Sequence, residues 1–474
     1  MLTVVLRAWL TGESPGDRSR PDPPRPGIGH QPAGPPDAPR APARGGAGQE
    51  AGGGTAGQAC LRYRGGAAGG EDSGGEGNGV LGRSSMDNVT CIEDLRAMAL
   101  RRVPRAFFQY ADHGSYTQST LRANRAGLDA VRFRQRVGID VGTRQLSTII
   151  AGEPASLPLV LAPVGLCGML FGDGEILACR AAQAAGIPFC LSTMSICSIE
   201  DVAAAVREPF WFQLYLMRDR GFVRDLLGRV VAARCSALVI TLDLNVLGQR
   251  HCDIKNGMSV PPRITLANLA NVTARPAWAL SILRGRRKTF GNLAGHIPGG
   301  DNLRSVAQWT AAQFDPTLNW ADIEWIRALW PGRIILKGIL DPEDAKIAAR
   351  MGVSAIVVSN HGGRQLDGAP SAISALPAVA DAVGSDIEIM FDSGIRSGQD
   401  VLRALALGAR SCMIGRAYLY GLGAGGLQGV AKAIEIIRNE LDVSMALTGI
   451  TSVAAAGPQI IAAGSGIEAP RRPS

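Results

Sequence analysis

Residues 355–367 read A-I-V-V-S-N-H-G-G-R-Q-L-D, an apolar run that stops abruptly at polar residues. The run 355–358 is rich in β-branched residues, which is typical of a strand buried on both faces of a parallel sheet. His361 and Arg364 follow in a segment with two glycines, so the backbone can turn sharply while an imidazole and a guanidinium face the same space. This pattern predicts a base beside an anion-binding group. An ordinary loop with a hydrogen-bonded histidine is the alternative.

Apolar runs of strand length recur along the chain, and helical patterns separate most of them. The runs are 159–162, 187–191, 211–216, 237–242, 334–336, 355–358, 387–391 and 412–414. Strands alternating with helices predict an α/β fold, a (β/α)8 TIM barrel, with a doubly wound open sheet as the rival. Almost every run ends in polar or small residues, which favours the barrel because all its strands end at one mouth.

Two segments lie outside this repeating pattern. Residues 86–114 have helical spacing that is broken at Pro104, which predicts an N-terminal helical extension. Residues 252–319 form a long insertion after the fourth predicted strand, and a basic run at 284–288 follows apolar residues within it. We expect this insertion to be an active-site lid or an oligomer contact. Peripheral contact with a membrane is the alternative.

The first 85 residues differ in composition from the rest of the chain. Residues 1–85 are dominated by Gly, Pro, Ala and Arg and lack apolar periodicity, which predicts a disordered arm before a folded domain at 86–474. A translation start at Met86 is an alternative explanation of the arm. The net charge of +8 partly reflects this arm, and we expect no nucleic-acid partner. Nine cysteines without a C-x-x-C pattern indicate reduced thiols in a cytoplasmic protein, with no metal site.

Glycines and arginines occur together after the last two predicted strands. These loops commonly bind phosphate in barrels, and Gly394, Arg396, Gly415 and Arg416 offer the amides and guanidiniums that a phosphate needs. Turn glycines beside surface arginines are the alternative. A G-x-G-x-x-G pattern at 421–426 follows the final strand and opens no βαβ unit, so it does not predict a dinucleotide site.

Seven motifs occur in the order found in one enzyme family. They are LAPVGLCGM, WFQLYLMRDRG, TLDLNVLGQR, ILKG, SNHGGRQLDG, DSGIRSGQDVLRALALGA and IGRAYLYGL. Together they resemble the FMN-dependent α-hydroxy acid dehydrogenase and oxidase family, and within it the bacterial flavin-type L-lactate dehydrogenases. The resemblance implies an FMN cofactor and oxidation of an L-2-hydroxy acid to the 2-oxo acid, with L-lactate giving pyruvate. It also implies electron transfer to a quinone or a cytochrome, and a homotetramer.

The resemblance implies a role for individual residues. His361 would be the base that starts the oxidation, and Asp243 would hold its imidazole and stabilise the protonated form. Four side chains would bind the substrate, with the two guanidiniums clamping its carboxylate: Tyr110, Tyr215, Arg250 and Arg364. The residues that would bind FMN are Pro163, Val164, Gly165, Ser192, Gln213, Thr241, Lys337, Ser359, Asp392, Gly394, Arg396, Gly415 and Arg416. Taken singly, each has an ordinary structural explanation.

Two departures from the family pattern bear on the reaction. Met194 stands where glycolate-oxidising relatives carry an aromatic residue, which favours another substrate. Gly165 stands where many oxygen-using members carry alanine, which favours an acceptor other than oxygen. Mandelate dehydrogenation, oxygen-dependent oxidation and a catalytically silent scaffold are the alternatives. We expect a cytoplasmic protein, with peripheral contact at the inner face of the cytoplasmic membrane as the alternative.

Overall fold

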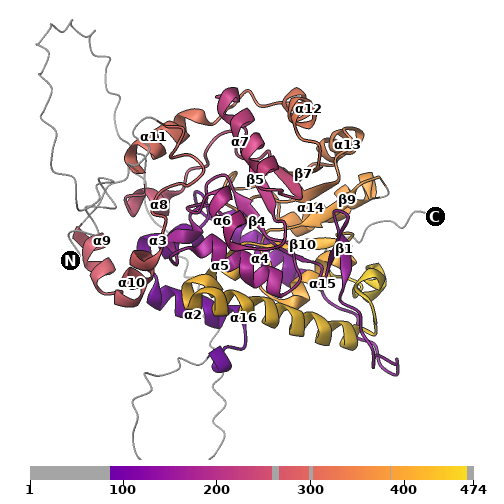
Figure 1. Cartoon of the computed structure of the whole chain (residues 1–474). Coiled ribbons are helices and arrows are strands. Elements are labelled where there is room, and N and C mark those ends of the chain that lie inside the picture. The colour runs from indigo at the N-terminus through magenta and orange to yellow at the C-terminus, as the bar shows by residue number, and fades with distance from the viewer. Residues whose placement is uncertain (1–85, 259–265, 298–302, 385, 467–474) are drawn as a thin grey trace, which may run out of the picture. The chain divides into compact units, whose positions relative to one another are not determined.

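Eight parallel strands form the centre of the computed structural model, which describes residues 86–258, 266–297, 303–384 and 386–466 (Figure 1). The strands are β3 (Leu159–Leu161), β4 (Cys190–Ser192), β5 (Trp211–Leu214), β6 (Ala237–Thr241), β7 (Arg333–Ile339), β8 (Ala355–Val358), β9 (Glu388–Phe391) and β10 (Ser411–Ile414). Each strand from β4 to β10 pairs with the next, and β10 pairs with β3. An isolated parallel bridge between Leu161 and Phe189 closes the circle. The predicted (β/α)8 barrel is confirmed.

Alternate residues of each strand belong to two different cores. In β8, Ala355 and Val357 lie in the cluster that fills the inside of the barrel. Ile356 and Val358 belong to the larger cluster between the strands and the surrounding helices. Because both faces of the strand are covered, the sequence is apolar at every position rather than at alternate ones.

The outer layer consists of helices that follow the strands. They are α5 (Gly174–Ala184), α6 (Ile199–Ala205), α7 (Arg220–Ala232), α12 (Trp320–Leu329), α13 (Pro342–Arg350), α14 (Ala372–Val383), α15 (Gly398–Ala406) and α16 (Arg416–Thr448). Side-chain oxygens of Ser198, Asp219 and Ser397 accept N–H bonds in the first turn of α6, α7 and α15, which fixes where these helices begin. In α16, a Cβ at Gly423 would lie 2.9 Å from Cγ2 of Val103, so this glycine allows close helix packing.

A β-hairpin closes the amino-terminal end of the barrel. It consists of β1 (Thr148–Ile150) and β2 (Glu153–Ala155), and Ile150, Ala151 and Ala155 join the inner core. The carboxylate of Glu153 accepts a hydrogen bond from Trp211 Nε1 at 3.1 Å and pairs with Arg333 Nη1 at 2.7 Å. The carboxyl ends of the strands are therefore the end at which a ligand can enter.

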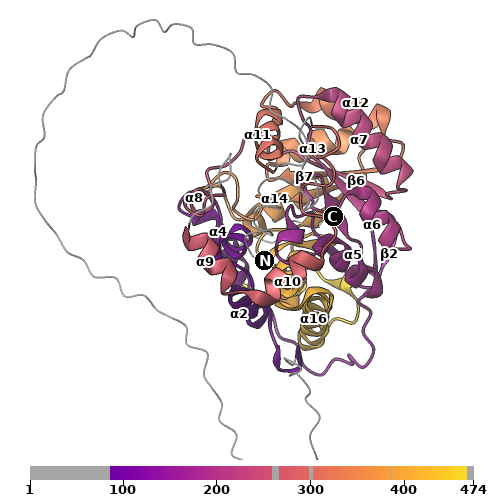
Figure 2. The same ribbon diagram turned by 60° about the vertical axis from the view of Figure 1, so that its left-hand side comes forward.

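The predicted extension and insertion both pack beside the barrel. The extension contains η1 (Met86–Asn88), α2 (Ile92–Arg102), α3 (Arg105–Asp112) and α4 (Ser119–Ala130), and the break predicted at Pro104 lies between α2 and α3. The insertion between β6 and β7 contains α8 (His251–Lys255), α9 (Leu266–Thr273), α10 (Pro276–Arg284) and α11 (Leu303–Gln313), and α9 contacts α3 and α10 (Figure 2). Trp278 of α10 stacks on Phe107 with 5.4 Å between ring centroids.

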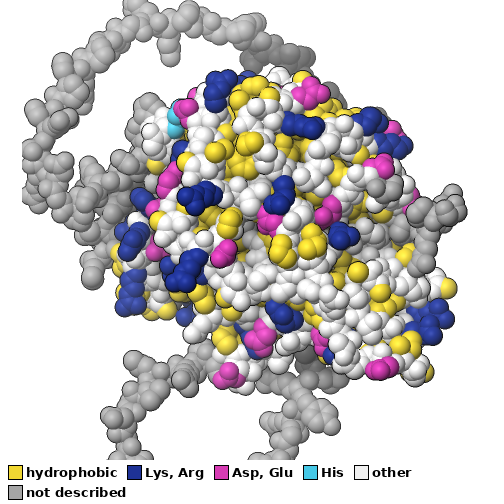
Figure 3. Space-filling model, turned by 45° about the vertical axis from the view of Figure 1, so that its right-hand side comes forward, with side chains coloured by type: hydrophobic (Ala, Val, Ile, Leu, Met, Phe, Trp, Pro, Cys, Tyr) yellow, Lys and Arg dark blue, Asp and Glu magenta, His cyan; other side chains and the backbone are white. Residues whose placement is uncertain are grey.

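Three short 3-10 helices complete the described elements: η2 (Cys167–Met169), η3 (Val453–Ala455) and η4 (Pro458–Ile460). Figure 3 shows a face on which basic and acidic side chains are intermixed with small apolar patches. None of the described helices is both long and apolar enough to cross a bilayer. The predicted arm at residues 1–85 lies outside the described residues.

Candidate active site

A histidine and an aspartate meet at the mouth of the barrel. His361 follows β8 and Asp243 follows β6, and their Nδ1 and Oδ1 atoms lie 2.8 Å apart. Gly338 makes room for the pair: its φ is +104°, and a Cβ there would lie 2.7 Å from the Asp243 carboxyl carbon. Burial lowers the pKa of His361 more than Asp243 raises it, so the pKa lies below its usual value. The imidazole is therefore neutral at neutral pH and can accept a proton at Nε2.

A lysine connects the histidine loop to the end of β9. Lys337 is 5% exposed, and its Nζ lies 2.7 Å from Asp392 Oδ2. The same Nζ donates to Ser359 Oγ at 2.8 Å, and Ser359 Oγ also accepts the N–H of His361 at 3.0 Å. Burial lowers the pKa of Lys337, but Asp392 and Asp243 outweigh this effect and raise the pKa above its usual value. Lys337 is thus a fixed cation beside the imidazole.

Two guanidiniums lie near the histidine. Arg250 Nε donates to the backbone oxygen of Arg364 at 3.3 Å. Arg364 Nη1 donates to the backbone oxygens of Tyr110 and His113, and its guanidinium carbon lies 4.7 Å from the centroid of the Tyr110 ring. Burial is the larger cause and repulsion from Arg364 the smaller cause of a lowered pKa for Arg250. Two cations that repel each other in a buried site favour the binding of an anion between them.

Tyr215, the second tyrosine predicted to bind the substrate, lies near the charges of Asp243, Arg250 and Arg364. Tyr215 follows β5, and burial together with the charge on Asp243 raises the pKa of its hydroxyl. Its backbone N–H donates to Thr193 Oγ1 at 3.2 Å rather than extending the strand. A neutral phenol of this kind can donate a hydrogen bond to a bound carboxylate or hydroxyl.

The loop after β3 and the carboxyl-terminal ends of β4, β5 and β6 supply the residues predicted to face a flavin ring. Ser192 Oγ donates to Gln213 Oε1 at 3.0 Å, while Gln213 Nε2 is buried and has no partner among the described residues. Thr241 pairs with Lys337 in the strand register and is 3% exposed. The segment 163–165 packs on the next loop, because a Cβ at Gly165 would lie 3.0 Å from Cβ of Met194.

The two predicted phosphate-loop arginines have different surroundings. Arg396 stacks on Tyr420, with 5.4 Å from its guanidinium carbon to the ring centroid, and its backbone N–H donates to Asp400. The buried guanidinium of Arg416 instead donates to backbone oxygens of Ala111, Asp112, His113 and Gly362. Gly394 has a φ of +109°, and a Cβ at Gly415 would lie 3.6 Å from Val164. The structure thus brings these loops together, with Arg416 bound to the carboxyl end of α3.

Comparison with known proteins identifies the family. The profile of the FMN-dependent dehydrogenases matches residues 99–463. The chain belongs to this family. An L-lactate dehydrogenase of Caulobacter vibrioides is 48% identical over 375 residues, which cover 79% of this chain and 98% of the relative.

Two enzymes with solved structures have a similar fold. The monotopic membrane protein (S)-mandelate dehydrogenase superposes with a TM-score of 0.76 at 32% identity, covering 79% of this chain and 99% of that chain. Mandelate oxidase superposes with a TM-score of 0.66 at 36% identity, covering 77% of this chain and 96% of that chain.

FMN, the cofactor of this family, fits the groups at the mouth. The unpartnered Nε2 of Gln213 is a buried donor that would be destabilising unless a ligand accepts its hydrogen bond. Lys337 supplies a buried cation of the kind that stabilises the charge a flavin ring gains on reduction. Among the described residues, no cluster of His, Cys, Asp or Glu is arranged to hold a metal ion.

Sequence reasoning missed one residue that joins two loops of the site. The Gln365 amide nitrogen donates to the backbone oxygens of Asp243 and Val246 at 2.8 and 2.9 Å. Its amide oxygen accepts the N–H of Gly248 at 3.3 Å and a weaker bond from Arg250 Nη2 at 3.4 Å. Gln365 therefore holds the loop after β6 against the loop after β8. Its position one residue after Arg364 was the signal that could have identified it.

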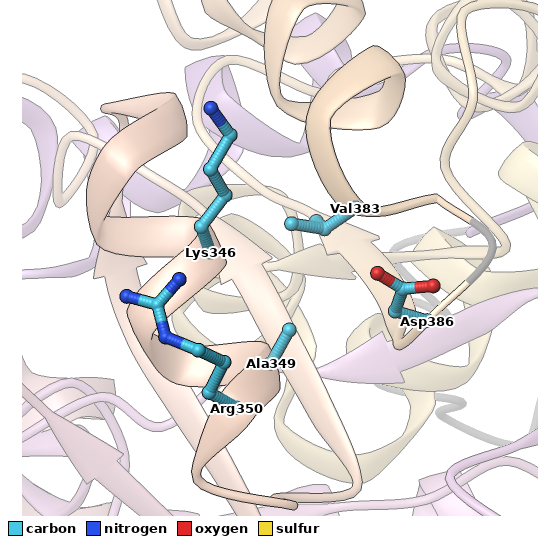
Figure 4. Close-up of a pocket in the computed structure, with 5 residues that line it drawn as sticks. All are labelled: Lys346, Ala349, Arg350, Val383 and Asp386. Atoms are coloured by element: carbon cyan, nitrogen blue, oxygen red, sulfur yellow. The ribbon is translucent and has the colours of Figure 1, made fainter.

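A hollow elsewhere on the barrel takes no part in the site. Its volume is about 310 Å³. Figure 4 shows the residues that line it between α13 and the end of α14: Lys346, Ala349, Arg350, Val383 and Asp386. The carboxyl ends of these helices lead into β8 and β9, so the hollow lies toward the amino-terminal end of the strands, away from His361.

Proposed function

We propose that the protein oxidises L-lactate to pyruvate and passes the electrons to a quinone or a cytochrome. The observation that carries this proposal is the Asp243–His361 pair, 2.8 Å apart, beside the guanidiniums of Arg250 and Arg364. The 48% identity to an L-lactate dehydrogenase over nearly its whole length supports lactate as the substrate. Mandelate is the second candidate because mandelate dehydrogenase is a structural relative.

Each side chain in this proposal has a defined task. Arg250 and Arg364 bind the substrate carboxylate. To do so, Arg364 gives up its hydrogen bonds to the backbone oxygens at the end of α3 and bonds the carboxylate instead. Asp243 accepts a hydrogen bond from the Nδ1–H of His361, which leaves Nε2 to take a proton from the α-carbon or the hydroxyl of lactate. Asp243 then stabilises the imidazolium that forms. Bound FMN supplies the acceptor for the two electrons that lactate loses, and Lys337 lies ready to stabilise the resulting charge.

An anaerobic absorbance titration tests this proposal. The purified protein, loaded with FMN, is mixed with L-lactate, D-lactate or (S)-mandelate in separate cuvettes. We expect the flavin bands to bleach with L-lactate alone. Bleaching with mandelate alone would show that mandelate, and not L-lactate, is the substrate. A flavin that stays oxidised with every hydroxy acid would contradict the proposed reaction.

We further propose that the insertion contacts a membrane surface. Leu266 of α9 is 87% exposed, and Leu280 and Leu283 of α10 are 46% and 37% exposed. Exposed basic residues Arg284, Arg286 and Lys288 follow at the end of α10. Apolar side chains beside basic ones are typical of helices that lie on anionic lipid. The membrane association stated for (S)-mandelate dehydrogenase supports this location, which would also suit a lipid-soluble quinone.

Sedimentation with vesicles of phosphatidylglycerol and phosphatidylcholine tests the membrane contact. We expect the wild-type protein to sediment with the vesicles and the double variant Leu280→Ser/Leu283→Ser to remain in the supernatant. The matched control is Val443→Ser/Leu447→Ser on α16, where both residues are 55% exposed. A wild-type protein that stays in the supernatant, or a control that behaves like the test variant, would contradict the contact.

A further inference from the structure

Ser393 has a backbone conformation that a serine adopts only at a cost. It follows Asp392 in the loop after β9, its φ is +86°, and it is 7% exposed. Left-handed φ values crowd the Cβ of an L-residue, so glycine is the residue that the backbone alone favours here. The next residue, Gly394, also has a positive φ. A serine in such a strained conformation points to a function for its side chain.

The hydroxyl of Ser393 makes three hydrogen bonds within the site. Its Oγ accepts the backbone N–H of Asn360 at 3.3 Å and of Gly362 at 3.1 Å, the residues on either side of His361. It donates its own proton to Asp392 Oδ1 at 2.7 Å. The other oxygen of Asp392 pairs with Lys337 Nζ. One hydroxyl thus joins the turn that carries the base to the carboxylate that pairs with the buried lysine.

We propose that Ser393 is a positioning residue that fixes the His361 turn through its hydroxyl, at the expense of backbone strain. This inference rests on the proposed role of His361 as the base. His361 itself has a φ of +57°, so its turn is left-handed and needs external partners to be held in one orientation. Without the hydroxyl, the N–H groups of Asn360 and Gly362 would lose their acceptor, and the turn would hold the imidazole less firmly beside Asp243.

At this position the Cβ lowers stability through backbone strain, whereas the hydroxyl is proposed to support kcat. Two substitutions separate these effects. Ser393→Gly removes both the strain and the hydroxyl, whereas Ser393→Ala removes the hydroxyl and keeps the Cβ. We expect kcat for L-lactate to fall about tenfold in both variants, as the loss of two hydrogen bonds that hold a reacting group implies. KM should change less than twofold because Arg250 and Arg364 are untouched. The glycine variant should unfold at a higher temperature than the alanine variant.

Arg234→Gly is the matched control for strain relief. Arg234 follows α7, has a φ of +56° and is exposed, and it lies at the opposite end of the barrel from His361. We expect this variant to gain thermal stability with an unchanged kcat. All proteins are assayed at saturating FMN, and flavin content is measured by absorbance so that cofactor loss is not mistaken for a loss of rate.

Two results would overturn the role of Ser393. One is a kcat within twofold of wild type in both Ser393 variants. The other is a kcat that falls in Ser393→Ala but not in Ser393→Gly, because strain rather than the hydroxyl would then explain the loss. Failure of the wild-type flavin to be reduced by L-lactate would instead reject the proposed function, so the two failures are distinguishable.

Discussion

A buried or partly buried carboxylate lies at each end of the barrel, and the two carboxylates differ in how many of their oxygens have a partner. At the amino-terminal end, both oxygens of Glu153 have partners, Trp211 on one and Arg333 on the other. At the mouth, Asp243 uses Oδ1 for His361, and its buried Oδ2 has no partner among the described residues. The carboxylate at the closed end therefore has both oxygens paired, whereas the carboxylate at the mouth has one buried oxygen left over for a ligand.

Unpartnered polar atoms at the mouth lower the stability of the fold but leave groups that can bind a ligand. A buried polar atom without a partner costs about 1–3 kcal/mol, and Gln213 Nε2 is a second one at the mouth. Substitutions at the mouth should therefore affect turnover more than folding, and substitutions at the closed end should affect folding more than turnover. Four predictions test this contrast, beginning with the largest expected effect.

The largest effect is expected when the base is removed. His361→Gln should reduce the rate of flavin reduction by about 10⁴-fold while FMN stays bound, because glutamine cannot take the substrate proton. Stopped-flow absorbance under anaerobic conditions measures this rate. The matched control is His296→Gln, since His296 also faces an aspartate, with Nε2 3.3 Å from Asp219 Oδ2. Retention of more than a tenth of the wild-type rate would remove His361 from the base role.

Replacing the partner of the base should have the next largest effect and a signature in pH. Asp243→Asn should reduce kcat about 10³-fold because the imidazolium loses its stabilising charge. Asp243 raises the pKa of His361 against the effect of burial, so its removal lowers that pKa further. The acid limb of the kcat/KM profile should therefore lie at lower pH in this variant than in the wild type. A shift to higher pH would contradict the pairing.

Breaking the link between the two loops should have a smaller effect. Gln365→Met keeps the side-chain length but removes the hydrogen bonds to Asp243, Val246 and Gly248. We expect kcat/KM for L-lactate to fall about tenfold, mainly through KM, because Arg250 is no longer held in place. Steady-state kinetics with a soluble electron acceptor measures it. The exposed Gln399→Met is the control, and an equal loss in that variant would make the effect nonspecific.

The smallest effect on turnover is expected at the closed end. Glu153→Ala leaves the indole N–H of Trp211 without its acceptor, which should lower the free energy of unfolding by about 1–3 kcal/mol. The lost ion pair adds little because Arg333 is 40% exposed. Denaturant unfolding measures the stability, and kcat should stay within twofold of wild type. A large loss of kcat without a loss of stability would reverse the contrast drawn above.

The sequence allowed most of the barrel to be predicted, and the errors have local causes. The strand predicted at 187–191 is observed as β4 at Cys190–Ser192, since Pro188 lacks the N–H that a ladder needs. The strand predicted at 334–336 extends to Ile339, because an irregularity between Lys337 and Ile339 lets pairing with β8 continue. The predicted run 355–358 coincides with β8, whose boundaries are set by the apolar residues alone.

The proximity of His361 and Asp243 could be predicted because both follow strands of one barrel. The partners of Arg364 and Arg416 could not, since both guanidiniums bind backbone oxygens at the end of α3, and a backbone oxygen has no signature in the sequence. Ser393 was likewise invisible, because its importance lies in a φ value and in two N–H groups. The individual roles assigned to the site residues remain predictions.

The bonds of Arg416 also constrain how the protein is made. Its Nε reaches the backbone oxygen of Ala111, 305 residues earlier in the chain. During synthesis, the end of α3 leaves the ribosome long before β10 and the start of α16 do, so the mouth cannot assemble until almost the whole domain has been translated. We therefore expect FMN to be loaded late in the maturation of each new chain, after the end of α3 and the start of α16 have met.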